Sequence, residues 1–280
     1  MTANLTRHEL YNIRLHKILA AVLYCSEKCW SGIRALFYLF SRKSNAMRSV
    51  RTGEIYEVQG ETGEAIRYFR KALSRYPKLL SVRLNLCRSY LRMLSLKEAK
   101  EHGLIFLRKK PDDPEINLYI GVILYYEGKL EDAITHLEKT ADLLPATEKK
   151  TASAFEYIGE CCLKLQRYED AAGYLKKSIA VNPYGSEKKY VSLGEAYYLL
   201  NKKEEALSTF KRALEVNPDN CEAWNNIGVL MWSVGNLENA CKCFRKSIEI
   251  NPGYKEARTN LNSVEESMNS IKLNVKKKVR

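Results

Sequence analysis

The residues best suited to chemistry in this chain are its cysteines and histidines, which can bind metals or take part in redox and acid–base reactions. Two pairs of cysteines lie close together in the sequence, Cys161–Cys162 and Cys241–x–Cys243. The histidines are scattered and lack the short spacings of metal ligands. They are His8, His16, His102 and His136. No glycine-rich loop that could cradle a phosphate occurs in the sequence either. We therefore expect a protein that is not an enzyme and that carries no cofactor and no metal.

The number of cysteines bears on whether the protein is found in an oxidising or a reducing compartment of the cell. Eight cysteines in a chain of 280 residues do not suggest a disulfide framework, because a chain of this length can bury a large apolar core without covalent cross-links. Small buried thiols that pack between helices are the better interpretation. We therefore expect a reducing compartment and a cytoplasmic location.

The formal net charge of +13 at pH 7 raises the question of nucleic-acid binding. Most of this charge lies at the two ends of the chain. The first 51 residues carry a net +7 and the last ten carry +5, which leaves +1 for residues 52–270. Because a site for a phosphate backbone needs basic residues along its length, nucleic acid is not an expected partner. Basic ends favour acidic partners or anionic membrane surfaces, or they serve only to keep the protein soluble.

Most of the chain is a repeat with a period of about 34 residues. Each copy has an alanine in one position and ends with a proline, and five of the six copies have a glycine in a third position. The copies are 46–79, 80–113, 114–147, 152–185, 187–220 and 221–254. The alanines are Ala65, Ala99, Ala133, Ala171, Ala206 and Ala240, and the glycines are Gly53, Gly121, Gly159, Gly194 and Gly228.

Each copy has the spacing of two amphipathic helices joined by a turn. Apolar residues recur at intervals of three and four, as one buried helix face requires. The shared alanine and glycine let the two helices approach closely, and the proline ends the second helix. The turns are marked by Gly60, Gly128, Asn201 and Gly235. Because one hairpin cannot bury its own apolar faces, the copies should stack on one another.

This pattern resembles the tetratricopeptide repeat, which has an aromatic residue, Leu-Gly, Tyr, Ala, Phe, Ala and Pro at set positions. In the fifth copy these residues are Tyr190, Leu193, Gly194, Tyr197, Ala206, Phe210, Ala213 and Pro218. The resemblance implies an all-α fold, a right-handed α-solenoid of helix-turn-helix hairpins. The first two copies fit least well, since Gly103 replaces a large apolar residue and Ser49 and Arg83 replace aromatic ones.

The two ends of the chain lie outside the repeats. Residues 255–270 should form a C-terminal capping helix, followed by a basic tail at 271–280. Residues 1–45 form a basic, amphipathic helical segment. Glu27, Lys28 and Arg34 interrupt any apolar stretch long enough to span a membrane, and the segment also lacks the features of a signal peptide. Residues 1–45 therefore either cap the solenoid or make peripheral contact with a membrane or a partner.

The resemblance also implies where a partner would bind. In this family the first helices of successive repeats line a concave groove that binds peptide segments of other proteins. The candidate groove residues are Arg88, Arg92, Tyr125, Tyr126, Glu156, Glu160, Glu195, Tyr198, Asn225 and Trp232. Among them, Tyr126 and Trp232 are the strongest candidates. The set of Lys, Asn and Arg residues with which some members bind a C-terminal carboxylate is missing, so we do not expect that activity.

These observations predict a scaffold for protein–protein interaction that binds an extended or helical segment of another protein. The alternative is a membrane-associated assembly or adaptor factor, tethered through its N-terminal amphipathic segment.

Overall fold

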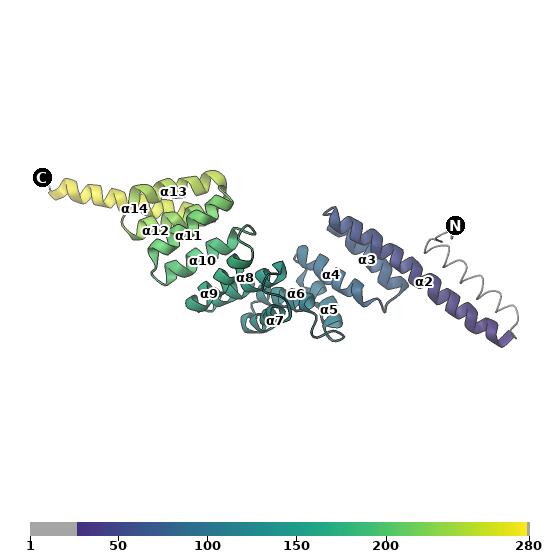
Figure 1. Ribbon diagram of the computed structural model, residues 1–280. Helices are drawn as coiled ribbons and strands as arrows, with labels where there is room; N and C mark the ends of the chain where they lie inside the picture. The colour runs from purple at the N-terminus through teal and green to yellow at the C-terminus, as the bar shows by residue number, and fades with distance from the viewer. Residues whose placement is uncertain (1–26, 279–280) are drawn as a thin grey trace, which may run out of the picture. The chain divides into compact units, whose positions relative to one another are not determined.

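The computed structural model describes residues 27–278, which form α-helices from α2 to α14 and contain no strand (Figure 1). The predicted all-α fold is therefore confirmed for this part of the chain. The chain divides into two compact units, one up to Ser95 and one from Leu96 onward. The division falls in the predicted turn of the second repeat.

The first unit contains three described helices, α2 (Glu27–Val58), α3 (Thr62–Arg75) and α4 (Leu80–Arg92). Helix α2 has 32 residues, so the expected boundary at residue 45 lies inside it. Its C-terminal half provides the first helix of the first repeat, and Ala46 and Val50 pack there with Phe69 of α3 and Leu86 of α4. Residues 27–45 thus continue a repeat helix, while residues 1–26 of the predicted N-terminal segment lie outside the described residues.

The second unit contains ten helices among its described residues. They are α5 (Leu96–Leu107), α6 (Pro114–Tyr126), α7 (Leu130–Leu143), α8 (Lys149–Lys164), α9 (Tyr168–Val181), α10 (Lys188–Leu199), α11 (Lys203–Val216), α12 (Cys221–Ser233), α13 (Leu237–Ile250) and α14 (Lys255–Lys278). From α6 onward, each first helix packs against the second helix that follows it in sequence, as in α6 with α7 and α8 with α9. The predicted stack of hairpins is therefore present in this unit.

The predicted close approach of the two helices has a clear steric basis in five repeats. A Cβ atom added to the first-helix glycine would lie 2.5–2.7 Å from the nearest side-chain atom of a buried residue on the second helix. The pairs are Gly53 with Phe69, Gly121 with Leu137, Gly159 with Leu175, Gly194 with Phe210, and Gly228 with Phe244. In the second repeat the larger residue, Cys87, lies on the first helix and the glycine, Gly103, lies on the second. This is also the repeat in which the division between the two units falls.

The turns between paired helices use left-handed backbone conformations. All four predicted turn residues have positive φ, which is 81° at Gly60, 77° at Gly128, 58° at Asn201 and 78° at Gly235. Glycine and asparagine tolerate this region better than other residues. Leu94 and Gln166 adopt it as well, with φ of 54° and 60°. Their side chains gave no indication of this in the sequence, so only the repeat register could have located these two turns.

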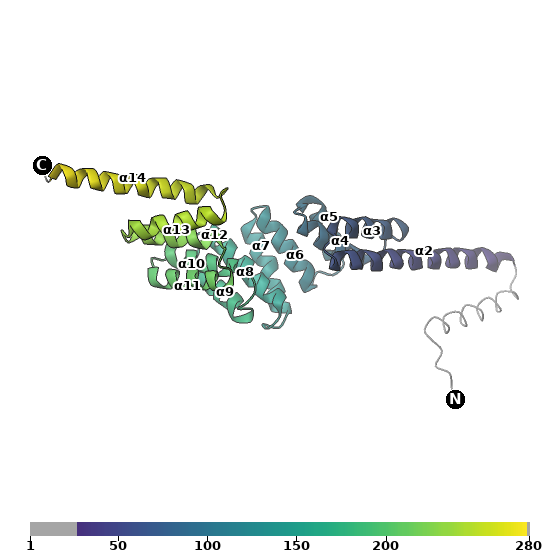
Figure 2. The same ribbon diagram turned by 90° about the horizontal axis from the view of Figure 1, so that it is seen from above.

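Helix α14 covers the last hairpin. Leu261, Val264 and Met268 pack with Phe244 and Cys241 of α13. The helix lies along α13 and continues past it to Lys278 (Figures 1 and 2). Residues 271–278 of the expected tail are therefore helical.

Candidate functional site

The first helices of the second unit form the inner layer of its stack. Helices α6, α8 and α10 each contact the next first helix directly, and α12 contacts α14. The second helices have no comparable contacts with one another. In a curved stack the helices on the inner side lie closer together than those on the outer side. The exposed faces of these first helices therefore line the inner side. Most of the predicted groove residues lie on them.

Arg88 and Arg92 lie in the first unit, where both interact with a glutamate of α2. The Arg88 Nε atom lies 2.9 Å from Glu57 Oε1, and its Nη2 atom lies 2.5 Å from Glu57 Oε2. The Ser89 hydroxyl also donates to Glu57 Oε1, at 3.1 Å, and Arg92 Nη1 lies 3.7 Å from the same atom. Arg88 therefore holds a buried carboxylate within the chain. Sequence reasoning missed Glu57 because the pair joins different repeats and forms only when they stack.

Three tyrosines gather where α6 meets α8. The Tyr125 ring lies edge-on to Tyr126 and to Tyr157, with centroids 5.2 and 5.4 Å apart, and Lys164 Nζ lies 4.5 Å from the Tyr125 centroid. Tyr125 is buried, and this burial, followed by its hydrogen bond to Glu160, raises the pKa of its hydroxyl. Tyr126 is 45% exposed. Tyr126 is thus the accessible ring of an aromatic cluster, of which the sequence had indicated all but Tyr157.

Glu160 of α8 forms an ion pair with Lys188 of α10. The Lys188 Nζ atom lies 2.7 Å from Oε1 of Glu160, and it donates a hydrogen bond of 2.9 Å to Oε2. Burial alone would lower the pKa of Lys188, but the hydrogen bond and the charge of Glu160 outweigh burial and raise it. Burial, and next the charge of Glu160, also raise the pKa of Glu156. The lysine therefore stays charged and balances one of two neighbouring acidic groups.

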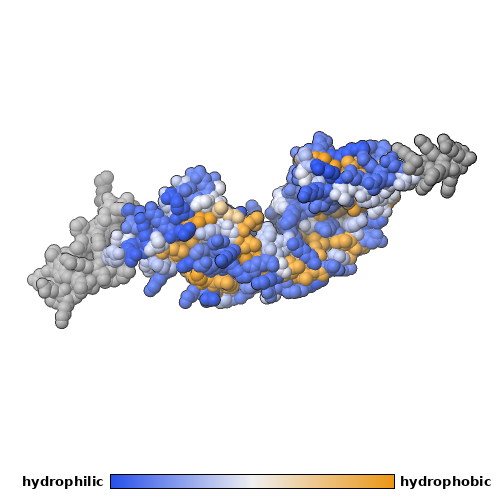
Figure 3. Space-filling model, turned by 180° about the vertical axis from the view of Figure 1, so that it is seen from behind, coloured by the Kyte–Doolittle hydropathy of each residue, from blue (hydrophilic) through white to orange (hydrophobic). Residues whose placement is uncertain are grey.

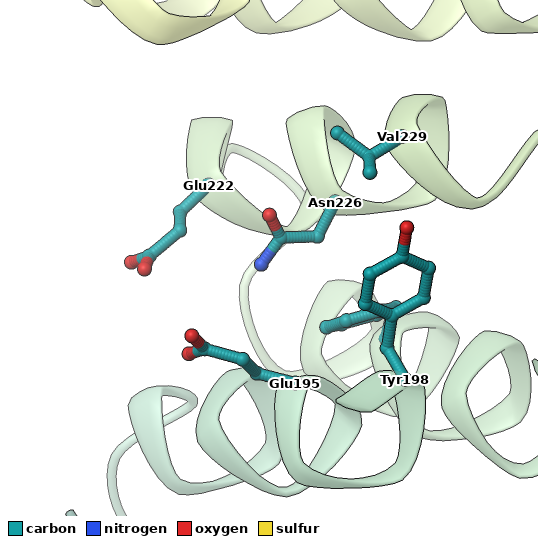
Figure 4. Close-up of a pocket in the computed structure, with 6 residues that line it drawn as sticks. Glu195, Tyr198, Glu222, Asn226 and Val229 are labelled. Atoms are coloured by element: carbon teal, nitrogen blue, oxygen red, sulfur yellow. The ribbon is translucent and has the colours of Figure 1, made fainter. Parts of the chain in front are cut away.

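A pocket of about 200 Å³ lies between α10 and α12 (Figure 4). It is lined by Glu195, Tyr198, Phe210, Glu222, Asn226 and Val229. Figure 4 shows the carboxylates of Glu195 and Glu222 pointing into the same space, with Tyr198 and Val229 further along the pocket. Glu195 and Glu222 are both exposed residues, but the neighbouring protein atoms desolvate their carboxylates in part. This desolvation, and next the charge of Glu222, raise the pKa of Glu195. Desolvation also raises the pKa of Glu222, and the positive charge of Lys188 offsets only part of this increase.

Glu195 and Tyr198 were predicted as groove residues, whereas Glu222 was not. The sequence could have indicated Glu222 through a change of charge at one repeat position. The second residue of the fifth repeat is Lys188, and the second residue of the sixth is Glu222.

Asn225 and Trp232 lie near the C-terminal cap. Asn225 is 5% exposed, and its Oδ1 atom accepts a hydrogen bond of 2.9 Å from Asn260 Nδ2 on α14. Trp232 packs in part against the cluster of α13 and α14 that includes Phe244 and Val264. Helix α14 therefore covers Asn225 and borders Trp232.

Exposure alone does not single out a binding residue in this molecule. On the face seen in Figure 3, hydrophilic residues predominate and apolar residues form separate patches. Single exposed aromatic residues are common on protein surfaces, and Tyr184, in the loop before α10, is 88% exposed. Tyr126 differs from Tyr184 because it lies on the inner layer of first helices beside two further tyrosine rings.

Four cysteines of the described part of the chain, Cys87, Cys161, Cys162 and Cys241, are buried. Cys161 and Cys162 are buried, and burial raises the pKa of their thiols to about 12 and about 11. Thiols with such pKa values are poor nucleophiles at neutral pH. In the part of the chain that the structure describes, no group of three or more His, Cys, Asp or Glu residues could hold a metal ion. No helix of that part is long and apolar enough to cross a membrane.

Comparisons with known proteins agree on the repeat. Sequence models of the tetratricopeptide repeat match residues 49–78, 113–183, 194–235 and 222–254. No curated protein sequence matches the chain significantly. The similar solved structures include a chain of the APC/C hetero-tetramer Cut9–Hcn1, at 16% identity and a TM-score of 0.69 over 79% of this chain and 43% of that one. This chain thus spans less than half the length of that relative.

Two further solved structures cover more of their own length. Pseudomonas aeruginosa pilF is 18% identical, with a TM-score of 0.65 over 78% of this chain and 97% of pilF. YrrB, whose structure is described as a TPR protein with an unusual peptide-binding site, is 21% identical, with a TM-score of 0.54 over 68% and 96% of the two chains. At these identities the likeness shows the fold alone.

Proposed function

The chain belongs to the tetratricopeptide repeat family, and we propose that it is a scaffold whose helices α6, α8, α10 and α12 bind an extended or helical segment of another protein. Two similar structures are described in terms that agree with this role. YrrB is described as having a peptide-binding site, and Cut9–Hcn1 as a hetero-tetramer.

The observation that carries the proposal is the row of first helices with an accessible aromatic ring on α6, the first of them. Tyr126 is 45% exposed, and Tyr125 and Tyr157 pack against each other beside it. A ring held by its neighbours loses little conformational entropy when it meets a partner, which is why tyrosine is common among residues that dominate binding energy. Tyr198 of α10 offers a second ring on the same layer, at the pocket.

A screen of the full chain against a random library of twelve-residue peptides tests this function. Peptides that bind the inner layer should bind at least about ten-fold more weakly when Tyr126 and Tyr198 are both changed to alanine, since each ring is the kind of anchor that dominates such contacts. Tyr184→Ala is the matched control, because Tyr184 is exposed but lies in a loop. Circular dichroism of each variant confirms folding. If the double variant binds every selected peptide as tightly as the control does, the inner layer is not the binding surface.

The alternative role, attachment to a membrane, depends on the basic N-terminal segment. The first 51 residues carry a net charge of +7, which favours anionic lipid surfaces. A truncation that tests this role should remove residues 1–26 only, because removing residues 27–45 would cut into α2. Residues 1–26 carry +2 of this charge and residues 27–51 carry +5. Sedimentation with vesicles of phosphatidylcholine and phosphatidylserine should therefore deplete the full chain more than the truncated one. Equal sedimentation of both would argue against a tether in that segment.

A further inference from the structure

Two neighbouring junctions of the stack carry different charges in equivalent positions. Glu160 and Glu195 are the ninth residues of the fourth and fifth repeats, and each faces the first helix of the next repeat. The second residue of that next repeat is Lys188 in the first case and Glu222 in the second. The repeat therefore places a lysine opposite one carboxylate and a second carboxylate opposite the other.

The structure shows the consequence of this exchange. At the junction of α8 and α10, the Lys188 ammonium lies 2.7 Å from a Glu160 oxygen. At the junction of α10 and α12, neither Glu195 nor Glu222 forms an ion pair with any residue of the described range 27–278. Lys188, the cation that acts on Glu222 at longer range, is already bound to Glu160.

The space beside these two carboxylates has the size and lining for a single side chain. Its volume of about 200 Å³ is below the roughly 300–1,000 Å³ of sites for small molecules and cofactors. The carboxylates lie together in the pocket, and Tyr198, Phe210 and Val229 provide its aromatic and aliphatic lining. Lysine and arginine side chains match this division, because they have an apolar stem and a cationic head.

We propose that the pocket between α10 and α12 binds a lysine or arginine side chain of the partner segment, with the cationic head between Glu195 and Glu222 and the stem against Tyr198 and Val229. The side chain would form an ion pair with Glu195, as Lys188 does with Glu160 one repeat earlier. Hydrogen bonds between charged groups are among the stronger contacts in proteins, so this contact would select basic segments. The inference rests on the proposed function, since it assumes that the inner layer receives a partner.

A divalent metal is the competing occupant. Calcium takes six to eight oxygen ligands, whereas this pocket offers two carboxylates and one amide side chain, that of Asn226. No third acidic, histidine or cysteine ligand joins them within the described residues. The pocket therefore fits an organic cation better than a metal ion.

The experiment uses n-butylammonium, which has the stem and head of a lysine side chain, as the probe. It is titrated into the full chain labelled with ¹³C-glutamate at constant ionic strength, and the carboxylate shifts are followed by NMR. We expect the Glu195 and Glu222 signals to shift together and to saturate. Butan-1-ol, which lacks the charge, and calcium chloride are titrated in parallel.

Glu222→Lys is the informative variant, because it gives this junction the lysine of its neighbour. It should weaken butylammonium binding at least ten-fold, while Glu204→Lys, the same charge change on the exposed side of α11, should leave binding unchanged. Equal shifts at all glutamates, undiminished binding in Glu222→Lys, or saturation by butan-1-ol or calcium at lower concentration than by butylammonium would each overturn the proposal.

The same variants separate this inference from the function on which it rests. Library peptides whose binding depends on Tyr126 should carry a lysine or arginine that strengthens binding to the wild-type chain. In Glu222→Lys that basic residue should no longer strengthen binding. Peptides that depend on Tyr126 but need no basic residue would overturn the pocket assignment alone. A library in which no peptide depends on Tyr126 or Tyr198 would overturn both.

Discussion

The junction between α8 and α10 and the junction between α10 and α12 share a glutamate in one position but carry opposite charges in the position that faces it. At the first, Lys188 binds Glu160 within the chain, with an N–O distance of 2.7 Å. At the second, Glu222 takes the place of the lysine and leaves Glu195 facing another carboxylate beside a pocket. In a repeat protein the backbone supplies the same geometry many times. A single change of charge can therefore turn a closed structural contact into an open acceptor for a partner.

The largest expected effect comes from disturbing α10, the helix that both junctions share. In Gly194→Ala the new Cβ would meet the Phe210 ring at 2.5 Å, so either the buried ring or one of the two helices must shift. Overpacking of this kind costs about 1–3 kcal/mol of unfolding free energy. Urea unfolding followed by circular dichroism measures this loss.

Gly173→Ala on α9 is the matched control for that variant. An added Cβ there meets nothing within 4 Å, and alanine favours a helix over glycine by about 0.5–1 kcal/mol. The same substitution should therefore stabilise the protein at one site and destabilise it at the other. Equal effects at both sites would show that the contact between Gly194 and Phe210 does not hold the hairpin together.

A smaller loss is expected when the closed junction is opened. Lys188→Met keeps the length of the side chain but leaves Glu160, which is 5% exposed, without its cation. Breaking a fully buried pair costs about 3–5 kcal/mol, but Lys188 is half exposed, so we expect about 1–2 kcal/mol. Urea unfolding of Lys188→Met and of Lys211→Met, on the exposed face of α11, gives the comparison. A loss no larger than that of Lys211→Met would mean that the pair contributes nothing.

The smallest effect concerns the open junction and depends on pH. The pKa of Glu195 is raised above its ordinary value of 4.5 in the folded protein, so the folded state takes up a proton more readily than the unfolded state does. The free energy of unfolding should therefore decrease as the pH rises through the window just above 4.5. Glu195→Gln lacks this decrease and should be the more stable form at neutral pH, by less than about 0.5 kcal/mol.

Urea unfolding of wild type and Glu195→Gln at neutral pH and below pH 4.5 measures this difference. The advantage of the glutamine variant should vanish at the lower pH. A difference that stays the same at both pH values would show that the carboxylate is not destabilised by its surroundings.

The sequence alone was sufficient to predict the hairpins, because their contacts are local. Gly194 and Phe210 belong to one repeat, and their positions recur at a constant spacing, so the period reveals the pair. The turn at Gly128 could be predicted for the same reason. The turn at Gln166 carries no such residue, although its φ is 60°, and the neighbouring copies alone imply its conformation.

The candidate site was predicted less completely, because its contacts join different repeats. Tyr126 and Tyr198 were identified from the register of the first helices. Asn225 was identified in the same way, yet α14 covers it, since Asn260 reaches its side chain across 35 residues of sequence. Periodicity says which face of a helix is shared by all copies, but it does not say which neighbour will cover that face.

The amino-acid sequence by itself thus determined the family, the all-α class and the close packing within each hairpin, because a repeated local pattern encodes them. Only the tertiary structure decided that Arg88 is held by Glu57, that Lys188 is held by Glu160, and that Glu195 and Glu222 are left with a pocket. The physical reason is that the interaction of two charges depends on the distance between them in space and not on their separation in the sequence. Stacking brings together side chains that lie about thirty residues apart, and their signs then decide whether a contact closes within the chain or stays open to a partner.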